Sequence, residues 1–211
     1  MKIAVYNNKG GVGKSTLTSH VAFKAMELQM PLYVLDSDRQ RNTTSWLSGH
    51  TKTSTGYTIG SVTVSHDISD LDVHSDKLCL IDCPPVFSVV EHLSTEVDAW
   101  LVPVGSRFSV DGLLNILSEL RGQRVIAVVN QAVNQLKKLS AYEAAQIQSV
   151  GVEVFNRTIP LHDHFRQAEA LGRPVWRIPY GAKTTAAEAM NEFAFWVLNG
   201  LKGKTVGGSY V

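Results

Sequence analysis

Short continuous runs of apolar residues alternate with longer stretches of helical periodicity along most of this chain. The apolar runs predict strands at residues 2–6, 32–35, 78–81, 100–104 and 125–129. The helical patterns occupy residues 14–29, 42–47, 88–97, 110–121, 140–149, 163–171 and 184–200. Strands that are apolar throughout are typical of a parallel sheet that is buried on both faces. The pattern therefore predicts an α/β fold, with one doubly wound, mostly parallel sheet and helices on both of its faces.

Length and composition set the limits of this fold. A chain of 211 residues, 44% of them hydrophobic, is expected to form one ordinary domain, which we place at residues 1–201. The Gly- and Lys-rich residues 202–211 are expected to form a flexible tail. Residues 49–76 are rich in Ser, Thr, Asp and His and cannot be assigned to any element from their pattern.

The compartment is predicted from three features. No apolar run approaches the roughly 20 residues that cross a bilayer. The N-terminus begins as a strand and does not resemble a secretion signal. Cys79 and Cys83 do not suit a disulfide framework or a CxxC site, so we expect two reduced thiols in the core of a cytoplasmic protein.

Candidate chemistry is concentrated in the turn between the first strand and the first helix. Its sequence is Lys9-Gly10-Gly11-Val12-Gly13-Lys14-Ser15-Thr16. A Gly-rich turn lets backbone N–H groups surround phosphate oxygens, and the following helix points its positive end at the same anion. Lys14 would reach the β- and γ-phosphates, and the hydroxyl of Ser15 would bind Mg²⁺. The strict P-loop pattern requires a glycine where this chain has Asn8, and Lys9 is an additional lysine.

Carboxylates stand at the ends of two predicted strands. Asp36 and Asp38 follow the second strand, at the edge of the sheet where ligands bind in open α/β folds. Asp82 ends the third strand, in the position of the Walker B carboxylate that binds Mg²⁺ directly or through water. Alternatives stay open, because Asp36 and Asp38 could cap the helix at 42–47 and Asp82 could belong to a simple turn.

The motif KGGVGKST and the strand ends LDSD and LIDCPP resemble the ParA/MinD class of deviant-Walker P-loop ATPases over roughly residues 1–200. The resemblance implies that Lys9 crosses a homodimer interface to the ATP bound by the other subunit. It also implies that Asp38 lies near the attacking water and that Asp36 orders water on Mg²⁺. Lys9, Lys14 and Asp38 are then the expected catalytic residues of a slow ATP hydrolase. The family usually has proline where this chain has Arg39.

The choice of base is predicted from the end of the fifth strand. GTP-specific P-loop proteins place an Asp three residues after an Asn in this position, whereas this chain has Val133 three residues after Asn130. ATP is therefore favoured over GTP. The resemblance places Ile178, Pro179 and Tyr180 against the adenine. Asn130 could contact the base or act only as a structural capping residue.

Charge is distributed unevenly, although the net charge is only +1. Residues 1–120 hold 9 Lys/Arg and 13 Asp/Glu, whereas residues 121–211 hold 11 and 6. A basic C-terminal half can bind an anionic surface, but it can also be an ordinary solvated surface. The segments 40–47 and 159–175 are similar to the small ParA-type partition ATPases. Candidate DNA contacts are Arg166, Arg173, Arg177 and Lys183.

This branch of the family implies partition of DNA or positioning of cargo. Its ATP-bound dimer coats double-stranded DNA without sequence preference, which would make the protein nucleoid-associated, and a ParB-like or other adaptor protein stimulates hydrolysis. Larger relatives carry an N-terminal helix-turn-helix, whereas this sequence starts at the first strand, so sequence-specific DNA recognition is not expected.

Three alternatives compete with partition. A MinD-like membrane-associated ATPase would need a basic amphipathic anchor. The spacing of Phe193 and Val197 in the helix at 184–200 instead fits packing on the sheet, so no stable membrane anchor is expected. A metal-handling relative would need an exposed cysteine pair. A non-catalytic nucleotide-binding module would not need both Asp38 and Asp82.

Overall fold

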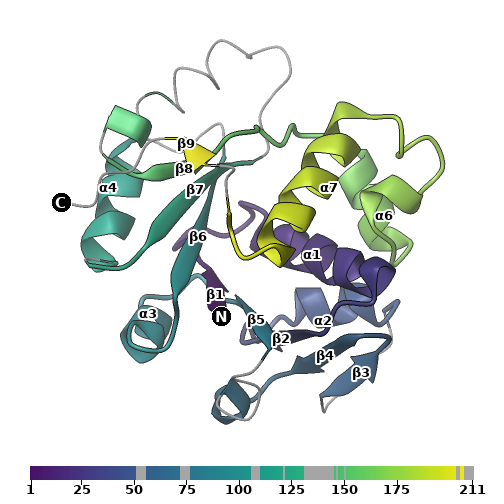
Figure 1. Ribbon diagram of the computed structural model, residues 1–211, viewed down its shortest axis with the longest axis horizontal. Helices are drawn as coiled ribbons and strands as arrows, with labels where there is room; N and C mark the ends of the chain where they lie inside the picture. Colours follow the sequence, from purple (N-terminus) through teal and green to yellow (C-terminus); the bar gives the residue numbers. More distant parts are fainter. Residues whose placement is uncertain are drawn as a thin grey trace.

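The computed structural model of the protein has a twisted central sheet with helices on both faces (Figure 1). The structure describes residues 1–50, 56–71, 77–105, 110–120, 122–130, 145, 147–149, 151–202 and 205–206. The strands of these residues are β1 (Lys2–Val5), β2 (Leu32–Asp36), β3 (Tyr57–Ile59), β4 (Val62–Ser65), β5 (Leu78–Asp82), β6 (Ala99–Val104), β7 (Val125–Val129), β8 (Glu153–Phe155) and β9 (Thr205–Val206). Their order is β3-β4-β2-β5-β1-β6-β7-β8-β9. All neighbours are parallel except the two outermost pairs, β3 with β4 and β8 with β9. The predicted doubly wound, mostly parallel sheet is therefore confirmed.

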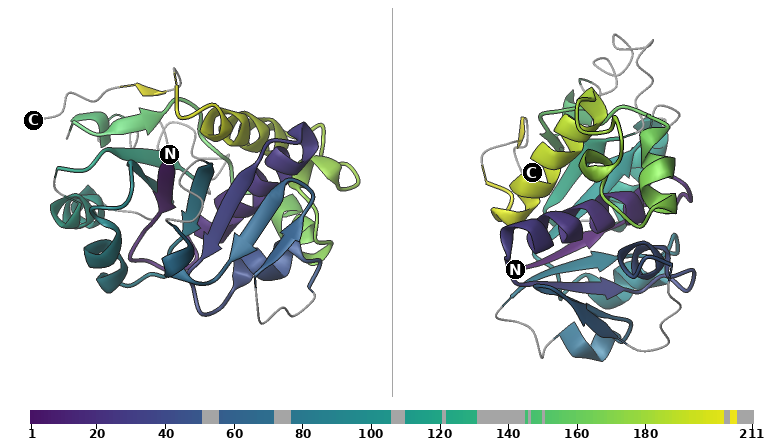
Figure 2. Two further views of the ribbon diagram at one scale, coloured as in Figure 1. Left: turned by 60° about the horizontal axis from the view of Figure 1, so that its bottom comes forward. Right: turned by 90° about the vertical axis from the view of Figure 1, so that its right-hand side faces the viewer.

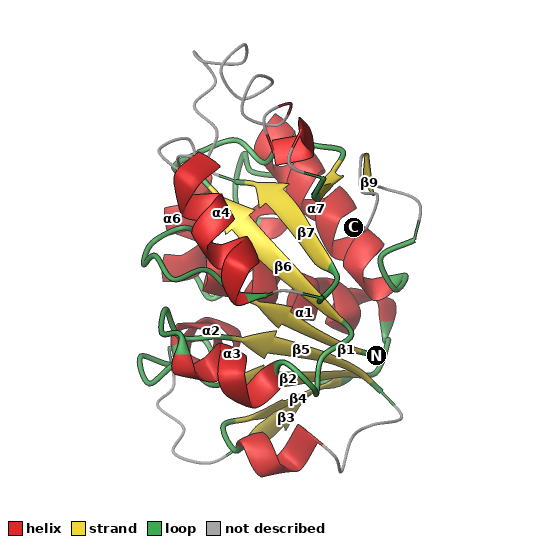
Figure 3. Ribbon diagram, turned by 90° about the vertical axis from the view of Figure 1, so that its left-hand side faces the viewer, coloured by secondary structure: helices red, strands yellow, loops and turns green. Residues whose placement is uncertain are grey.

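The helices divide between the two faces of the sheet (Figures 1 and 3). One face carries α1 (Lys14–Leu28), α2 (Asn42–Leu47), α6 (His164–Ala170) and α7 (Thr185–Leu198). The opposite face carries α3 (Ser88–Leu93) and α4 (Val110–Glu119). Two short 3₁₀ turns, η1 (Ile68–Leu71) and η3 (Val175–Arg177), connect the larger elements. Of the helix expected at 140–149, residues 145 and 147–149 are helical and the rest lies outside the described residues.

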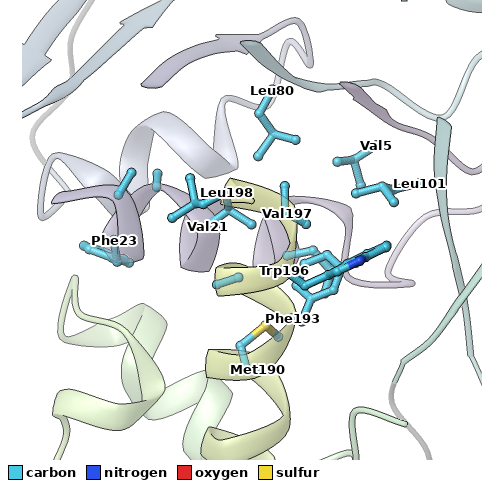
Figure 4. Packing of buried hydrophobic residues seen from close by; sticks show 14 of the residues in the cluster. Val5, Val21, Phe23, Leu80, Leu101, Met190, Phe193, Trp196, Val197 and Leu198 are labelled. Atoms are coloured by element: carbon cyan, nitrogen blue, oxygen red, sulfur yellow. The ribbon is translucent and has the colours of Figure 1, made fainter. Parts of the chain in front are cut away.

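The side chains on the two faces of the central sheet pack into two separate hydrophobic cores. Ile3 and Val5 point into the core beneath α1 and α7, whereas Ala4 and Tyr6 point into the core beneath α3 and α4. This alternation explains why the central strands are apolar throughout. Figure 4 shows Phe193, Trp196 and Val197 of α7 packed toward β1 and β6. Each fully buried side chain of this size stabilises the fold by about 1.5–3 kcal/mol.

The sheet is wider than the sequence pattern predicts. All five expected strands are present. In addition, β3 and β4 lie within residues 49–76, which the pattern could not assign, and β8 and β9 were not predicted. Thr205 and Val206, within the expected tail, pair with β8. Residues 203–204 and 207–211 lie outside the described residues, and the division at residue 201 stays a prediction. Among the described residues, no helix has the length and apolar character needed to span a bilayer.

The topology brings the predicted site residues to one edge of the sheet. β1 lies between β5 and β6, and β5 lies between β1 and β2. In register, Val5 and Asp36 both stand opposite Asp82. Because these strands are parallel, the segments that follow β1, β2 and β5 leave the same edge side by side (Figure 2).

Candidate nucleotide-binding site

The loop between β1 and α1 has the backbone geometry of a phosphate cradle. Gly11 and Gly13 have φ of 73° and 95°, in the left-handed region that favours glycine. Gly13 is the N-cap of α1 and contributes no side chain there, so the amides at the start of the helix are not capped by it. The loop is therefore shaped to present N–H groups and the positive end of α1 to an anion.

Two side chains hold this loop in place. The Asn7 side chain is fully buried; its Nδ2 donates to the carbonyl of Pro103 at 2.8 Å, and its Oδ1 accepts from the backbone N–H of Lys9 at 2.8 Å. The Lys14 side chain is also buried, and its ammonium donates to the carbonyls of Asn7 and Lys9, both at 3.2 Å. Sequence reasoning missed Asn7, although a buried polar residue between a strand and a P-loop was a signal for such an anchor.

Asp36 and Asp82 lie side by side beneath the loop, and both are buried. Asp36 Oδ2 accepts from the backbone N–H and the hydroxyl of Thr44, at 2.8 and 2.7 Å. The Thr43 hydroxyl donates to Asp82 Oδ2 at 2.6 Å. Asp36 therefore does cap α2, the alternative left open by the sequence. This capping uses only one of its oxygens.

The second oxygen of each carboxylate marks a place for a cation. Asp36 Oδ1 and Asp82 Oδ1 are buried and accept no hydrogen bond from the described part of the chain. Buried carboxylate oxygens require a compensating partner. Carboxylate and hydroxyl oxygens are the ligands that suit Mg²⁺, which is held in such sites by one or two carboxylates together with phosphates. Asp36, Asp82 and Ser15 therefore fit the Mg²⁺ site that the sequence predicted.

The pKa shifts of the buried charged groups also favour a Mg²⁺–phosphate ligand at this site. Burial, and next the neighbouring Asp36, raise the pKa of Asp82 to about 7, although Thr43, Ser15 and Lys14 oppose this rise. Burial likewise raises the pKa of Asp36, against the hydrogen bonds from Thr44. Burial lowers the pKa of Lys14, against the attraction of Asp82 and Asp38. A Mg²⁺–phosphate ligand would stabilise all three charged forms at once.

A cavity of about 800 Å³ opens over the loop. It is lined by Gly10, Gly11, Gly13, Lys14, Ser15, Thr16, Ser37, Asp38, Arg39, Gln40, Asn42, Trp46, Pro84, Pro85, Val86, Ser88 and Glu169. Asp38 Oδ1 accepts from the backbone N–H of Gln40 at 2.9 Å, which turns the segment between β2 and α2. The cavity thus joins the phosphate loop to the segments after β2 and β5, which we call switch 1 (residues 37–41) and switch 2 (residues 83–88).

Other predicted residues lie outside this cavity. Lys9 is exposed and does not line it, and its role in trans stays a prediction. Asn130 is buried, and its Nδ2 donates to the carbonyl of Val12 at 2.7 Å, which favours the structural reading of this residue. Ile178 is buried in the core, whereas Tyr180 is 90% exposed. None of Asn130, Ile178, Pro179 and Tyr180 lines the cavity, and their adenine contacts stay predictions. Val133 lies outside the described residues.

The four candidate DNA contacts are all exposed, on and after α6. Arg177 Nε lies 2.7 Å from Glu27 Oε1, so this guanidinium is already held in an ion pair. Arg166 lies on α6, the helix whose Glu169 lines the nucleotide cavity. Arg173 and Lys183 follow that helix. The expected basic surface therefore adjoins an element that reaches the nucleotide site.

The cysteines and histidines of the described residues form no metal centre. Cys79 and Cys83 are buried and unpaired, as expected for core thiols. His162 and His164 lie with ring centroids 4.4 Å apart. Within the described ranges, no group of three or more His, Cys, Asp or Glu side chains is arranged to hold a metal ion.

Comparison with known proteins agrees with this geometry. The profile described as "CobQ/CobB/MinD/ParA nucleotide binding domain" matches residues 3–175. No curated protein sequence matches the chain.

Three solved structures with the same fold have different functions. The MinD cell division protein of Aquifex aeolicus is 18% identical, with a TM-score of 0.71 over 98% of each chain. Cobyrinic acid a,c-diamide synthase of Mycobacterium smegmatis, with an ATP analogue and magnesium bound, is 18% identical, with a TM-score of 0.68 over 95% of each chain. A protein of Borrelia burgdorferi B31 described as a plasmid partition protein, bound to AMPPNP, is 14% identical, with a TM-score of 0.66 over 92% of this chain and 97% of that chain.

Proposed function

Because this chain belongs to the CobQ/CobB/MinD/ParA family of P-loop nucleotide-binding proteins, we propose that it is an ATP-dependent dimerising ATPase that partitions DNA or positions cargo. In the ATP state it binds double-stranded DNA without sequence preference, and a ParB-like or other adaptor protein stimulates hydrolysis. It acts in the cytoplasm, on the nucleoid.

The observation that supports ATP hydrolysis is that a phosphate-binding loop lies beside two buried carboxylate oxygens that have no hydrogen-bond partner among the described residues. Gly11, Gly13 and Lys14 supply the anion site, and Asp36 and Asp82 supply oxygens without a partner among the described residues. When bound, Mg²⁺ would neutralise charge on the β- and γ-phosphates. The chain's own residues bind and orient: Lys14 holds the phosphates and Asp38, at the cavity wall, positions the attacking water.

DNA is favoured over a membrane because the two candidate binding surfaces differ in exposure: most apolar anchor residues of α7 are buried, whereas the candidate DNA contacts are exposed. Of the apolar residues of α7 that a membrane anchor would need, Phe193, Trp196 and Leu198 are buried in the core, and only Phe195 is exposed. Arg166 is exposed on the helix that carries Glu169, and Arg173 and Lys183 are exposed in the segment between that helix and α7. Non-specific binding of DNA rests on such phosphate-neutralising side chains.

The test is binding of a random-sequence duplex with Mg²⁺ and either ATP or ADP, at two salt concentrations, followed by fluorescence anisotropy. We expect binding in ATP only, weaker at high salt. The variant Arg166→Ala/Arg173→Ala/Lys183→Ala should lose binding, and each lost phosphate contact should lower the slope of log affinity against log salt by about 0.9. Lys202→Ala, which removes an exposed lysine elsewhere, is the matched control. Equal binding in ATP and ADP, or none in either, would contradict the DNA branch.

A further inference from the structure

A chain of hydrogen bonds runs from the edge of the sheet into the nucleotide site. His66 directly follows β4, and its Nε2 lies 2.9 Å from the hydroxyl oxygen of Thr44, on α2. The same hydroxyl lies 2.7 Å from Asp36 Oδ2, at the end of β2. Thr44 is 2% exposed, so its hydroxyl can exchange these partners for water only if α2 moves. The chain thus joins three elements around one buried oxygen.

The positions of the protons in this chain are fixed by elementary donor rules. A hydroxyl has one hydrogen to donate, and an ionised carboxylate can only accept. When Asp36 is ionised, Thr44 must donate to it and must accept from His66. His66 therefore carries its proton on Nε2. In this tautomer the imidazole polarises the Thr44 hydroxyl toward Asp36, which strengthens the hydrogen bond to the carboxylate.

Other contacts hold the same end of α2. The hydroxyl of Tyr57 on β3 donates to the carbonyl of Thr44 at 3.1 Å. Arg41, the residue before α2, has the left-handed φ of 52°. Burial lowers the pKa of the His66 imidazole, and the nearby charge of Arg41 lowers it further, against the attraction of Asp36. Switch 1 is therefore confined between Asp36 at one end and the Thr44 anchor at the other.

We propose that His66 is a positioning residue for ATP hydrolysis, which acts through Thr44 to fix the Asp36 carboxylate and the end of switch 1. This role rests on the ATPase activity proposed above. With Thr44 held by His66, Asp36 Oδ2 is committed to α2 and Oδ1 is left to face the Mg²⁺ site. Without His66, the Thr44 hydroxyl loses its donor, and both the carboxylate and the segment that carries Asp38 become less constrained.

The proposal predicts a loss in turnover rather than in nucleotide affinity. His66 contacts no residue of the phosphate loop in the hydrogen bonds described for it, so ATP should bind nearly as well without it. A side chain that orients a metal-site ligand typically contributes about tenfold or more to activity. We therefore expect His66→Leu, which keeps the bulk but has no donor, to lower kcat about tenfold and to change KM for ATP less than twofold. The Mg²⁺ concentration for half-maximal rate should rise.

A conservative variant separates positioning from packing. The amide of His66→Gln can place an N–H near the position of imidazole Nε2 and should restore most of kcat and the Mg²⁺ dependence. His162→Leu is the control, because His162 is another partly buried histidine, and the ring nitrogen that accepts from the backbone N–H of His164 contacts neither α2 nor a residue that lines the cavity. It should leave both constants unchanged.

A double-mutant cycle with Thr44→Val completes the test, measured as steady-state ATP hydrolysis over a Mg²⁺ series. Residues that act as one unit show strongly non-additive effects, so His66→Leu should cost little further activity in the Thr44→Val background. Additive losses, or a Gln variant as poor as the Leu variant, would overturn the positioning role. If the wild-type protein hydrolyses ATP and His66→Leu matches it, only this inference fails; an inert wild-type protein would refute the ATPase itself.

Discussion

Lys14 is the residue on which the proposed nucleotide binding should depend most directly. Its ammonium is buried and, among the described residues, donates to the loop carbonyls of Asn7 and Lys9. Burial lowers its pKa, which means that the charged form lacks full compensation in the protein alone. A phosphate would supply that compensation, and neither water nor a neutral side chain can replace the cation in so closed a site.

Lys14→Ala should therefore weaken ATP binding by about 10–100-fold, since hydrogen bonds to charged groups contribute about 1.5–3 kcal/mol each. Titration of a fluorescent ATP analogue measures the change. Lys24→Ala is a suitable control, because Lys24 stands on the same helix but is paired with Glu27. Tight ATP binding by the Lys14 variant would be incompatible with the P-loop assignment.

The residues that the sequence predicts for this site are those that can be recognised from their neighbours in the chain alone. Gly11, Gly13 and Lys14 were predicted because a strand–loop–helix context needs no knowledge of the fold. Asp36 and Asp82 were predicted because both end buried strands. Thr43, Thr44 and His66 were missed, since their partners lie on other elements whose placement beside them the sequence does not reveal. Their significance appears only when β2, β4 and β5 lie side by side.

At the scale of elements, a buried imidazole is one of the contacts that join α1 to the segment before α7. His20 is fully buried among Trp46, Phe165 and Trp176. Its Nε2 accepts from the backbone N–H of Val175 at 3.0 Å, which makes the imidazole neutral at that nitrogen. The other ring nitrogen, Nδ1, then donates to the carbonyl of Thr16 at 2.7 Å. Protonation would remove the acceptor that Val175 needs.

This contact gives a pH dependence of stability. Burial lowers the pKa of His20 from 6.5 to about 4. The unfolded chain therefore binds the proton between pH 6.5 and 4 while the folded protein does not. The free energy of unfolding falls as the pH falls through this window, by up to about 1.4 kcal/mol per pH unit.

Urea unfolding of the wild type and of His20→Gln at pH 7 and pH 5 tests this expectation. The variant should be less stable at pH 7 but should lose less stability on acidification. The exposed His92 supplies the control variant His92→Gln, which should behave as the wild type. If His20→Gln loses as much stability as the wild type between the two pH values, the buried imidazole is not the titrating group.

A second junction joins α2 to the loop after α6. Trp46 Nε1 donates to the carbonyl of Arg173 at 3.1 Å, and a ring nitrogen of His50 lies 2.8 Å from the carbonyl of Glu169. Gly172 has φ of 59°, and a Cβ there would stand 2.8 Å from the Cα of Gly49. The two backbones meet so closely that neither partner can yield through a side-chain rotation.

Gly172→Ala should therefore destabilise the protein by more than the roughly 1–2 kcal/mol of a left-handed alanine alone. Gly122→Ala isolates that conformational part, because Gly122 has φ of 76° and a Cβ added there would meet nothing within 4 Å. The difference between the two variants in urea unfolding measures the close approach. Equal losses would show that the α2–α6 junction relaxes without cost.

The pattern could not predict β3 and β4, for a physical reason. β3 and β4 are three and four residues long, lie at the edge of the sheet and include threonines and a serine. Short edge strands lack the long apolar run of a strand buried on both faces. The central strands and the helices α1, α2, α3, α4, α6 and α7 were predictable because their own hydrophobic pattern determines them.

At the scale of the whole molecule, the two halves of the chain divide the proposed work. The N-terminal part supplies the phosphate loop and the carboxylates, and the C-terminal part supplies exposed cations on α6 and in the segment that follows it. The α2–α6 junction connects the two, because α2 follows switch 1 and α6 carries Glu169 at the cavity wall. A nucleotide-dependent shift of switch 1 would therefore reach the basic surface through packed elements.

We propose that ATP switches this protein between a monomer and a dimer through Lys9. Sedimentation of the wild type and of Lys9→Ala with Mg²⁺ and either ATP or ADP tests it most directly. We predict that the wild type forms a dimer in ATP and a monomer in ADP, while Lys9→Ala binds ATP and stays monomeric. A Lys9→Ala dimer as stable as that of the wild type, or a wild type that ignores the nucleotide, would contradict it.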